Sequence, residues 1–559
     1  MVPMRVRSLA PILALVILAI AIHATALSGF WLYDDPALLI ESILQPLSGT
    51  FFDPSEYTHL AAHTFTPLLL VSFKLDRLLH DFDPFVFYAH QVAAILTAAV
   101  LMYFVLRRYI PDIYATAGAG VFLMTWSAVY AARTLMIRHY VEGLVFALAA
   151  LLAWRRSKKL ASFFYLLAML SKEVYATIPL WFICESIYEW RVAGSGSRVG
   201  PPATRHKLPA VIVRDLIGPA ITVVVFLVWR WRMTGLTGTY AQSIAPPPNF
   251  AVLPRALWTH LVGPEAPPWA QMVWAIAIVV ACALFIWRFR PRAIAFLAVS
   301  LIVMLLPILP LTGNFEWRYS FAFVAFTVPL LTLALGTSGR RWPIAVLAIV
   351  LITTAVMSVH QRRYYEQLTR NGIATEGRYV WTQTPDAPVL AATSPAWYID
   401  GLRWLRRYEH RGDSPRAVFS VYAITAGMMD PAHMVGVDRG RIVPLTATNI
   451  FGTPADWPRA RGQFDPAEPL SIEFALRDHD ARWRLAPAAA RFLFLTDPGY
   501  TAISIPPAGV NRVPEARERQ FFRIVRQESN GRWTVSPTLP VPAEGAVTVW
   551  ARSTGTPGR

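Results

Sequence analysis

The chain has 559 residues and a formal net charge of +17, and 55% of its residues are hydrophobic while only 16% are charged. A soluble domain carries about 25% charged residues, so this deficit, together with repeated long apolar runs, excludes a simple soluble protein and indicates a polytopic membrane protein. The positive charge lies in short clusters between the apolar runs, as positive-inside loops require, which excludes nucleic acid as a partner.

The hydropathy pattern predicts about eleven membrane segments. In chain order they cover residues 9–30, 85–106, 114–131, 141–154, 160–170, 174–187, 212–229, 270–286, 293–311, 321–335 and 343–359. The two cysteines, Cys184 and Cys282, fall inside apolar segments and are interpreted as small apolar fillers. Arg5, Arg7 and the small residues up to Ala26 also resemble a cleavable secretory signal. Because the first apolar run continues to Phe30, a retained helix is favoured, and cleavage at Ala26 is the alternative.

The basic clusters predict the topology. They lie at 107–108, 155–159, 191–207, 288–292 and 340–341. All of them fall on one side of the predicted segments, which is the cytoplasmic side, and the N-terminus belongs there too. An odd number of crossings then places everything after Val359 outside. The sequence therefore predicts a transmembrane domain over 1–359, with an outer loop at 31–84, and an extracytoplasmic soluble domain over 360–559 in a bacterial inner or plasma membrane.

The first outer loop opens on Tyr33-Asp34-Asp35-Pro36. Two carboxylates at the mouth of a membrane helix are costly to keep near hydrocarbon, so they are candidates for a task; a solvated loop is the alternative. Residues 68–79 predict a helix along the interface, whose charges we interpret as those of an ordinary amphipathic packing helix. The histidines of this loop are scattered and give no metal signature; they are His59, His63 and His80.

After Val359 the composition changes to that of a soluble α/β domain, with no apolar run long enough to span a membrane. Ser394-Pro395 predicts a capped amphipathic helix. Short strands are predicted at 417–422, 470–475, 492–495, 521–525 and 547–550. This part shows no metal-ligand spacing and no nucleophile motif.

Acids and cations gather at the outer ends of the predicted helices. They are Asp34, Asp35, Arg133, Arg138, Lys172, Glu173 and Arg318. Cations there can bind a phosphate by charge-assisted hydrogen bonds, and a carboxylate can accept the proton of an attacking hydroxyl. Plainer interpretations stay open: Arg133 as a loop arginine, Lys172 and Glu173 as a neutralising pair, and Arg318 as an interfacial anchor.

Several motifs resemble the GT-C class of integral-membrane glycosyltransferases, near the protein O-mannosyltransferase and polyprenyl-phosphate-sugar transferase group. The resembling stretches are Tyr33-Asp34-Asp35-Pro36, Phe65-Thr66-Pro67-Leu68 with Ser72 to Asp76, Arg138 with Leu144 and Phe146, Leu170-Ser171-Lys172-Glu173 with Pro179, and Arg318-Tyr319. Departures are Thr66 where the family often has arginine, and Tyr88 and Gln91 where relatives often have His and Asn.

The resemblance implies a mainly α-helical GT-C-like fold and transfer of a sugar from a polyprenyl-phosphate donor to an acceptor hydroxyl. Asp34 or Asp35 would be the general base. Arg138, Lys172 and Arg318 would hold the leaving phosphate, and Glu173 and Tyr319 would complete the substrate-binding set. No metal or cofactor is expected, and the acceptor is a protein, glycan or lipid. A transporter or flippase of a lipid-linked anion, and a non-catalytic membrane scaffold, are the alternatives.

Overall fold

Helices long and apolar enough to cross a membrane dominate the first two thirds of the chain. The computed structural model describes residues 9–57, 65–186, 208–235, 251–289, 317–338, 341–384, 386–419, 422, 424, 433–445, 465, 468–477, 480–487, 491–497, 502–512, 521–530 and 532–552. Among them, seven stretches could span a bilayer: Leu9–Ser28, Pro84–Leu106, Leu135–Trp154, Ile212–Thr234, Pro268–Trp287, Arg318–Gly336 and Pro343–Arg370. The prediction of a mainly α-helical, multi-pass membrane protein is confirmed.

The chain divides into two units, each described by itself below. The N-terminal unit holds Met1–Gly29 and Ala37–Tyr365, and the C-terminal unit holds Phe30–Pro36 and Glu366–Arg559. The division falls inside two continuous helices, α2 (Asp35–Leu44) and α16 (Pro343–Arg370). The predicted extracytoplasmic location of the C-terminal residues stays a prediction.

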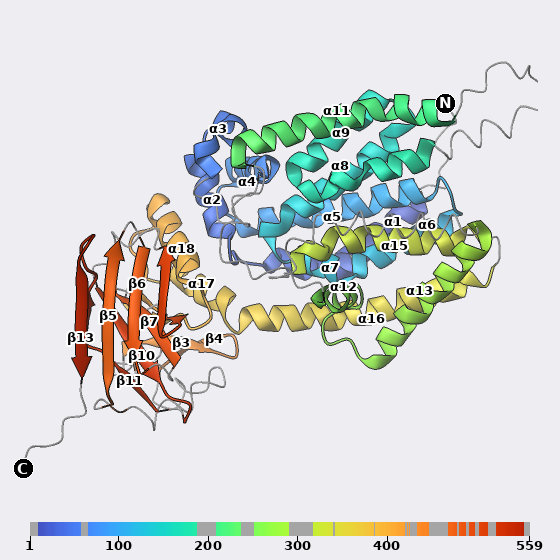
Figure 1. Ribbon diagram of the computed structural model, residues 1–559. Helices are drawn as coiled ribbons and strands as arrows, with labels where there is room; N and C mark the ends of the chain where they lie inside the picture. The colour runs from blue at the N-terminus through green and yellow to red at the C-terminus, as the bar shows by residue number, and fades with distance from the viewer. Residues whose placement is uncertain are drawn as a thin grey trace, which may run out of the picture. The chain divides into compact units, whose positions relative to one another are not determined.

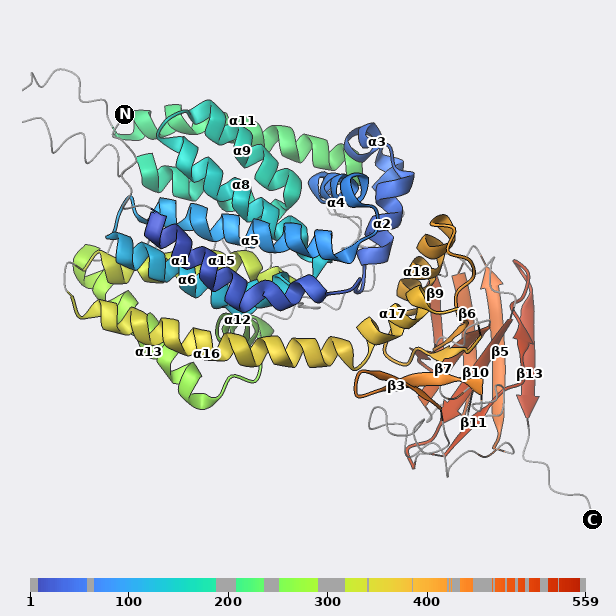
Figure 2. The same ribbon diagram turned by 180° about the vertical axis from the view of Figure 1, so that it is seen from behind.

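The remaining described helices up to α16 are, in chain order, α1 (Leu9–His23), η2 (Ala24–Ser28), α3 (Leu47–Phe52), η3 (Pro54–Tyr57), α4 (Pro67–His80), α5 (Pro84–Leu106), α6 (Asp112–Met124), α7 (Trp126–Ala131), η4 (Leu135–Ile137), α8 (Arg138–Trp154), α9 (Lys158–Ser171), η5 (Glu173–Thr177), α11 (Leu208–Thr234), α12 (Val252–Val262), α13 (Pro268–Phe289), η9 (Trp317–Ser320) and α15 (Phe321–Gly336). Helices α5, α8 and α9 lie side by side, and α11 packs on α9 (Figure 1). From behind, α1 is seen packed against α5 and α6 (Figure 2).

Helix starts follow the polar residues that cap them. The Asp83 side chain accepts a hydrogen bond from Phe85 N at 3.0 Å, with Pro84 in the first turn of α5. The Ser157 hydroxyl accepts from Leu160 N at 3.2 Å at the start of α9. The predicted segment 114–131 is not one helix, because Thr125 takes an extended backbone and its hydroxyl caps α7 through Ala128 N. The cap at Thr125 thus divides an apolar run that hydropathy alone predicts to be one helix.

Other predicted segments differ from the observed helices in length, and some observed helices were not predicted. Helix α9 is too short to span by itself, and the predicted segment 293–311 lies outside the described residues. The outer loop 31–84 is largely helical where described, through α2, α3 and α4. Helix α12 lies between the predicted segments 212–229 and 270–286, in a stretch for which the sequence predicts no membrane segment. Helix α4 confirms the predicted helix at 68–79, although its place relative to a membrane interface stays a prediction.

The C-terminal unit joins a small α/β layer to two antiparallel sheets. Its elements are α17 (Ile373–Thr382), β1 (Val389–Leu390), α18 (Ala396–Tyr408), β2 (Ala417–Val418), β3 (Val435–Asp438), β4 (Arg441–Pro444), β5 (Leu470–Arg477), β6 (Asp480–Ala486), β7 (Arg491–Asp497), β8 (Ala502–Ile505), β9 (Ala508–Arg512), β10 (Phe521–Gln527), β11 (Trp533–Val535), β12 (Leu539–Pro540) and β13 (Val547–Arg552). The first sheet has the order β2-β1-β3-β4, in which β1 pairs in parallel with β2 and β3. The prediction of an α/β domain is confirmed.

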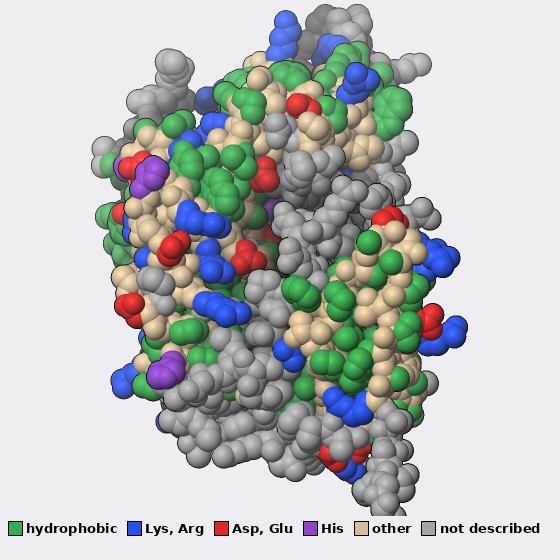
Figure 3. All heavy atoms as spheres, turned by 90° about the vertical axis from the view of Figure 1, so that its left-hand side faces the viewer, with side chains coloured by type: hydrophobic (Ala, Val, Ile, Leu, Met, Phe, Trp, Pro, Cys, Tyr) green, Lys and Arg blue, Asp and Glu red, His purple; other side chains and the backbone are tan. Residues whose placement is uncertain are grey.

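The two antiparallel sheets have the orders β11-β10-β7-β8, with β12 on β10, and β13-β5-β6-β9. Their inner faces share one apolar core, in which the Phe474 ring of β5 lies 4.7 Å from the Phe522 ring of β10. Strand β5 alternates buried and less buried residues, as a strand with one face in a core should. On the surface that Figure 3 shows, Lys and Arg side chains lie interspersed with hydrophobic ones.

Two local predictions for this unit need correction. The predicted strand 417–422 ends at Val418, and the Tyr422 ring packs on Trp533 with centroids 5.0 Å apart. Helix α18 begins after Pro395, but no side chain caps it, so Ser394 is not the cap that the sequence suggested. Proline supplies the helical start through its fixed φ rather than through a hydrogen bond.

Candidate functional site

A buried polar network joins helices α4, α5 and α8 of the N-terminal unit. Arg138, at the start of α8, is 0% exposed, and its Nη1 lies 2.5 Å from Asp76 Oδ2 on α4. Nη1 also donates to Ser72 Oγ at 3.1 Å, and Nη2 donates to the Phe87 carbonyl at 2.7 Å. The Phe73 ring lies 4.7 Å from the guanidinium carbon. Arg138 therefore already binds protein groups, and the phosphate contact that the resemblance implies for it stays a prediction.

A histidine bridges the carboxylates of this network. His90 Nδ1 lies 2.8 Å from Asp76 Oδ1, and His90 Nε2 lies 3.7 Å from Glu142 Oε1. The Ser72 hydroxyl donates to Glu142 Oε1 at 2.5 Å. Two basic side chains, Arg138 and His90, thus face two carboxyl groups, and polar groups inside a membrane protein usually pair with one another in this way. We call Ser72, Asp76, His90, Arg138 and Glu142 the α4–α8 network.

Sequence reasoning missed most of this network, because it took the α4 charges as those of a packing helix. A signal was present, however. Ser72 and Asp76 are four residues apart on α4, and Arg138 and Glu142 are four residues apart on α8. Residues at this spacing lie on one face of a helix, so each helix presents a polar pair on one of its faces.

A second polar group in the same unit gathers around Lys172, just after α9. Lys172 Nζ lies 3.4 Å from Glu173 Oε1, and the two side chains are 8% and 30% exposed. The ammonium lies 5.4 Å from the centre of the Tyr140 ring, a cation–π contact. Arg318 and Arg230 lie close enough for their charges to act on Lys172. We call Lys172, Glu173, Arg230 and Arg318 the Lys172 cluster.

The ionisation of the pair at the centre of this cluster is perturbed. Burial lowers the pKa of Lys172, and Arg318 and Arg230 lower it further, against the opposing charge of Glu173. Burial alone would raise the pKa of Glu173, but Lys172, its own backbone amide and Arg230 bring that pKa below its ordinary value. Among its four named members the cluster thus has three basic side chains and one carboxylate, a set that can bind an anionic ligand.

Arg318, the third cation of the Lys172 cluster, lies on η9, immediately before α15. Its guanidinium carbon lies 5.4 Å from the centre of the Tyr319 ring, and Tyr319 is buried. The next residue, Ser320, hydrogen-bonds to His260 of α12. His139, at the start of α8, lies within electrostatic reach of both Lys172 and Arg318. The structure therefore brings Arg318 together with Lys172 and Glu173, from which it is far apart in sequence, and adds Arg230 and His139.

Arg133 has a structural place instead. It is buried, and its Nη2 donates to Thr25 Oγ1 at 2.8 Å and to the Ile22 carbonyl at 3.3 Å. It therefore ties the chain after α7 to the end of the first span. This favours a structural role over the loop arginine that the sequence suggested.

The two predicted acids belong to the C-terminal unit, where their surroundings differ. Asp35 is fully buried; its Oδ2 accepts from Leu32 N at 2.8 Å, and its own amide donates to the Leu32 carbonyl at 2.9 Å. Tyr33, which directly precedes Asp34, has a φ of 47°, in the left-handed region that a tyrosine seldom adopts. Asp34, next in the turn, is only partly buried. Asp35 thus closes the turn, and Asp34 is the more accessible carboxylate.

This acidic turn is anchored within its own unit. The Tyr398 hydroxyl of α18 donates to the Trp31 carbonyl at 2.8 Å and to the Ile373 carbonyl of α17 at 3.3 Å. The Arg378 guanidinium carbon of α17 lies 5.4 Å from the centre of the Phe30 ring. Burial and the charge of Asp35 raise the pKa of Tyr33, so Tyr33 stays protonated beside the acids.

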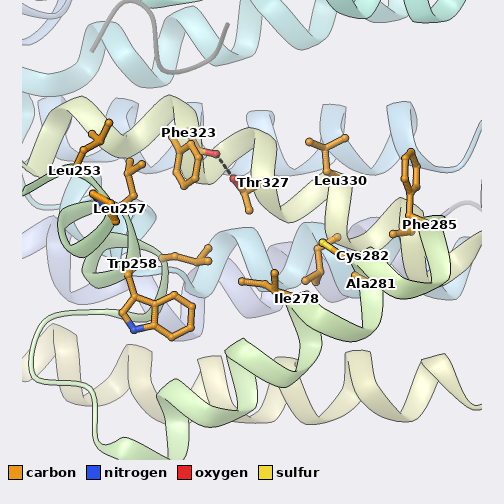
Figure 4. A pocket seen from close by; sticks show the side chains of 14 residues that line it. Leu253, Leu257, Trp258, Ile278, Ala281, Cys282, Phe285, Phe323, Thr327 and Leu330 are labelled. Carbon is orange, nitrogen blue, oxygen red and sulfur yellow. Dashed lines mark hydrogen bonds between the residues drawn. The ribbon is translucent and has the colours of Figure 1, made fainter. Parts of the chain in front are cut away.

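An apolar cavity of about 480 Å³ lies between α12, α13 and α15 (Figure 4). Its fourteen lining residues include Leu257 and Trp258 of α12, Phe285 of α13 and Phe323 of α15. The Thr327 hydroxyl already donates to the Phe323 carbonyl at 2.8 Å. The lining therefore suits hydrocarbon rather than a polar ligand.

Among the described residues, no group of three or more His, Cys, Asp and Glu side chains is placed to hold a metal ion. Cys184 and Cys282 are both free thiols. His59 and His63 lie outside the described residues. The expectation that no metal is needed stays a prediction.

No protein-family model and no curated protein sequence matches the chain. Two solved structures are similar to it. One is the Archaeoglobus fulgidus oligosaccharyltransferase tethered with an acceptor peptide, at 12% identity and a TM-score of 0.38, covering 74% of this chain and 64% of that one. The other is ArnT from Cupriavidus metallidurans bound to undecaprenyl phosphate, at 12% identity and a TM-score of 0.40, covering 77% of this chain and 97% of ArnT.

Both similar structures are GT-C glycosyltransferases, the class that the sequence motifs resemble. The chain spans less than two thirds of the length of the oligosaccharyltransferase. Both likenesses concern the fold alone.

Proposed function

We propose that the protein is a membrane glycosyltransferase that moves a sugar from a polyprenyl-phosphate donor to an acceptor hydroxyl on the extracytoplasmic face of a bacterial inner membrane. In this reaction the bond between the sugar carbon and the phosphate oxygen breaks, and a bond to the acceptor oxygen forms. The acceptor proton goes to a carboxylate base. The polyprenyl phosphate leaves with the electrons of the broken bond.

The observation that carries the proposal is the Lys172 cluster. Negative charge grows on the phosphate as the sugar leaves, and cations aimed at that charge stabilise the transition state more than the ground state. Lys172, Arg230 and Arg318 supply such cations from three separate elements of the unit. Since Lys172 is largely buried, its field is less screened by water than that of a surface lysine.

The proton acceptor in this proposal is Asp34. Asp35 is buried and bound to the Leu32 amide, so its carboxylate has a structural task. Asp34 is the accessible member of the pair, beside the left-handed Tyr33, and unusual backbone at a polar turn favours a functional origin. The motif resemblance supports the same choice.

The α4–α8 network has a separate place in the proposal. Arg138 either contacts the leaving phosphate, as the resemblance implies, or positions the start of α8 through Asp76 and Ser72. Tyr140, two residues further along α8, faces the Lys172 ammonium. The second role would therefore act on the Lys172 cluster through the first turn of α8.

The test is sugar transfer by the full chain in nanodiscs, using a panel of undecaprenyl-phosphate sugars and measuring both product and competition by free undecaprenyl phosphate. Loss of one charge-assisted contact to a developing anion typically costs about 10²–10³-fold in rate, and we expect Lys172→Ala and Arg318→Ala to fall in that range. Lys159→Ala is the matched control, because Lys159 is exposed near the other end of α9, about 20 Å away along the helix.

Equal transfer by Lys172→Ala, Arg318→Ala and the control would overturn the phosphate assignment. Movement of an intact fluorescent donor analogue across vesicles, with no sugar transfer, would establish the transporter instead. A chain that neither transfers nor moves any donor of the panel would fit the scaffold alternative.

A further inference from the structure

The exposed side of α18 in the C-terminal unit carries aromatic and cationic side chains at helical spacing. Trp397, Trp404 and Tyr408 are separated by seven and four residues and so lie on one face of the helix. Trp397 is 50% exposed and Tyr408 is 46% exposed. In the sequence, Arg403 directly precedes Trp404 and Arg407 directly precedes Tyr408. We call these five residues the α18 face.

The opposite side of the same helix explains why these aromatics are not part of the core. Ile399, Leu402 and Leu405 are fully buried and supply the apolar contacts of α18. Arg406 is buried as well, and its Nη1 donates to the Val380 and Trp381 carbonyls of α17 at 3.1 and 2.9 Å. The buried residues of the helix thus fix it to α17 from the side opposite Trp397 and Arg407.

The rings of this face are ordered rather than scattered. Trp404 and Tyr408 stack with centroids 5.5 Å apart and planes inclined by 9°. Arg403 is positioned by Asp400, at 3.7 Å, and by the Ser414 hydroxyl, at 3.1 Å. Arg407, Arg411 and Arg416 are exposed nearby. Exposed tryptophan and tyrosine beside arginine is the composition that favours the boundary between lipid headgroups and hydrocarbon.

The C-terminal unit is joined to a candidate membrane span by a short connection. Helix α17 begins at Ile373, shortly after the spanning helix α16 ends at Arg370. The polar end of α16, residues 360–370, adds about 16 Å of helix beyond its apolar part. A domain joined to a membrane span by so short a connection meets lipid at a high effective concentration, so weak interfacial contacts suffice.

We propose that the α18 face docks on the lipid headgroup region of the membrane, with its arginines on anionic headgroups and its aromatic rings at the acyl boundary. The contact anchors the C-terminal unit independently of the side of the membrane on which the unit lies. It does not depend on the glycosyltransferase reaction.

The experiment uses the full chain in nanodiscs, in a background carrying Cys184→Ala and Cys282→Ala. Single cysteines replace Trp404 or Tyr408, or, as the control, Val549 of β13, which is 72% exposed. Each is labelled with a nitrobenzoxadiazole fluorophore. Nanodiscs of phosphatidylcholine, with and without phosphatidylglycerol, then receive phospholipid with a doxyl quencher near the headgroup.

We expect the quencher to reduce emission at Trp404→Cys and Tyr408→Cys, more strongly with phosphatidylglycerol, and to leave Val549→Cys unchanged. Adding Arg403→Glu and Arg407→Glu should weaken the quenching at Trp404→Cys, since the reversed charges repel anionic headgroups. If the quencher leaves the emission at both α18 positions unchanged, the proposal is overturned. A blue-shifted emission without quenching overturns it too, because protein then covers the face. In a parallel sample with soluble glycan, a change in emission that needs the glycan and not the lipid quencher would also overturn the proposal.

Discussion

Breaking the buried pair between Arg138 and Asp76 should destabilise the N-terminal unit strongly. The guanidinium is 0% exposed, the carboxylate is 6% exposed, and their nearest atoms are 2.5 Å apart. Removing one partner of such a pair leaves an uncompensated buried charge and costs about 3–5 kcal/mol. We expect Arg138→Ala to lose stability of that order, because the buried Asp76 carboxylate then loses its guanidinium partner and keeps the His90 imidazole at 2.8 Å.

Removing both charges should cost much less than removing one. In Arg138→Met/Asp76→Leu, apolar side chains of similar size fill the space of the pair, and such replacements are often neutral or stabilising. The double variant should therefore recover most of the stability that Arg138→Ala loses. Arg138→Lys should be intermediate, because an ammonium cannot reproduce the planar bonds to Asp76, Ser72 and the Phe87 carbonyl together.

The assay is thermal unfolding in nanodiscs, followed by tryptophan fluorescence and by loss of monodisperse protein. Arg214→Ala is the matched control, since that arginine is 69% exposed and its partner Asp215, at 3.4 Å, keeps Lys158 at 3.5 Å; we expect its loss to cost less than that of the fully buried Arg138. If Arg138→Ala unfolds at the same temperature as the wild-type chain, the pair of Arg138 and Asp76 does not stabilise the fold. Transfer activity of the double variant then separates the two roles of Arg138: folded but inactive protein supports a phosphate contact, and folded, active protein removes it.

Three further predictions concern the acids, the lysine and the topology. Asp34→Asn should lose about 10²–10⁴-fold in sugar transfer at unchanged protein level, whereas Asp35→Asn should mainly lower thermal stability through the weakened bond to the Leu32 amide; the reverse pattern would exchange their roles. Because the pKa of Lys172 is lowered, binding of undecaprenyl phosphate should weaken as pH rises into a range where an ordinary lysine is still charged, and Lys172→Arg should retain binding there; identical pH profiles would exclude Lys172 from the anion site. A reporter active only outside the cytoplasm, fused after Arg363, should be active, and an inactive fusion would reverse the orientation.

Composition and hydropathy determined the class of protein and most of its helices. The apolar runs that became α5, α8, α11, α13, α15 and α16 are visible because a bilayer demands about 20 apolar residues per span, whatever their neighbours. The short strands predicted at 470–475, 492–495, 521–525 and 547–550 likewise became parts of β5, β7, β10 and β13. These are local consequences of the solvent that each segment meets.

Breaks within apolar runs and helices within polar loops were decided by the tertiary structure. Thr125 ends one helix and caps the next, although hydropathy does not change there. Helix α12 lies in a proline-rich loop, and its His260 side chain bonds to Ser320, sixty residues away. Hydropathy averages over such single hydrogen bonds, so it cannot locate them.

The candidate site shows the same division. The sequence alone singled out Asp34, Asp35, Lys172 and Arg318, because charged residues at the ends of membrane helices are expensive and few. It could not say that Arg138 would be enclosed by Asp76, Ser72 and the Phe87 carbonyl, or that Asp35 would close a turn while Asp34 stayed accessible. A charge acquires its role from the partner that folding brings within hydrogen-bond distance, and that partner is set by helix packing rather than by position in the chain.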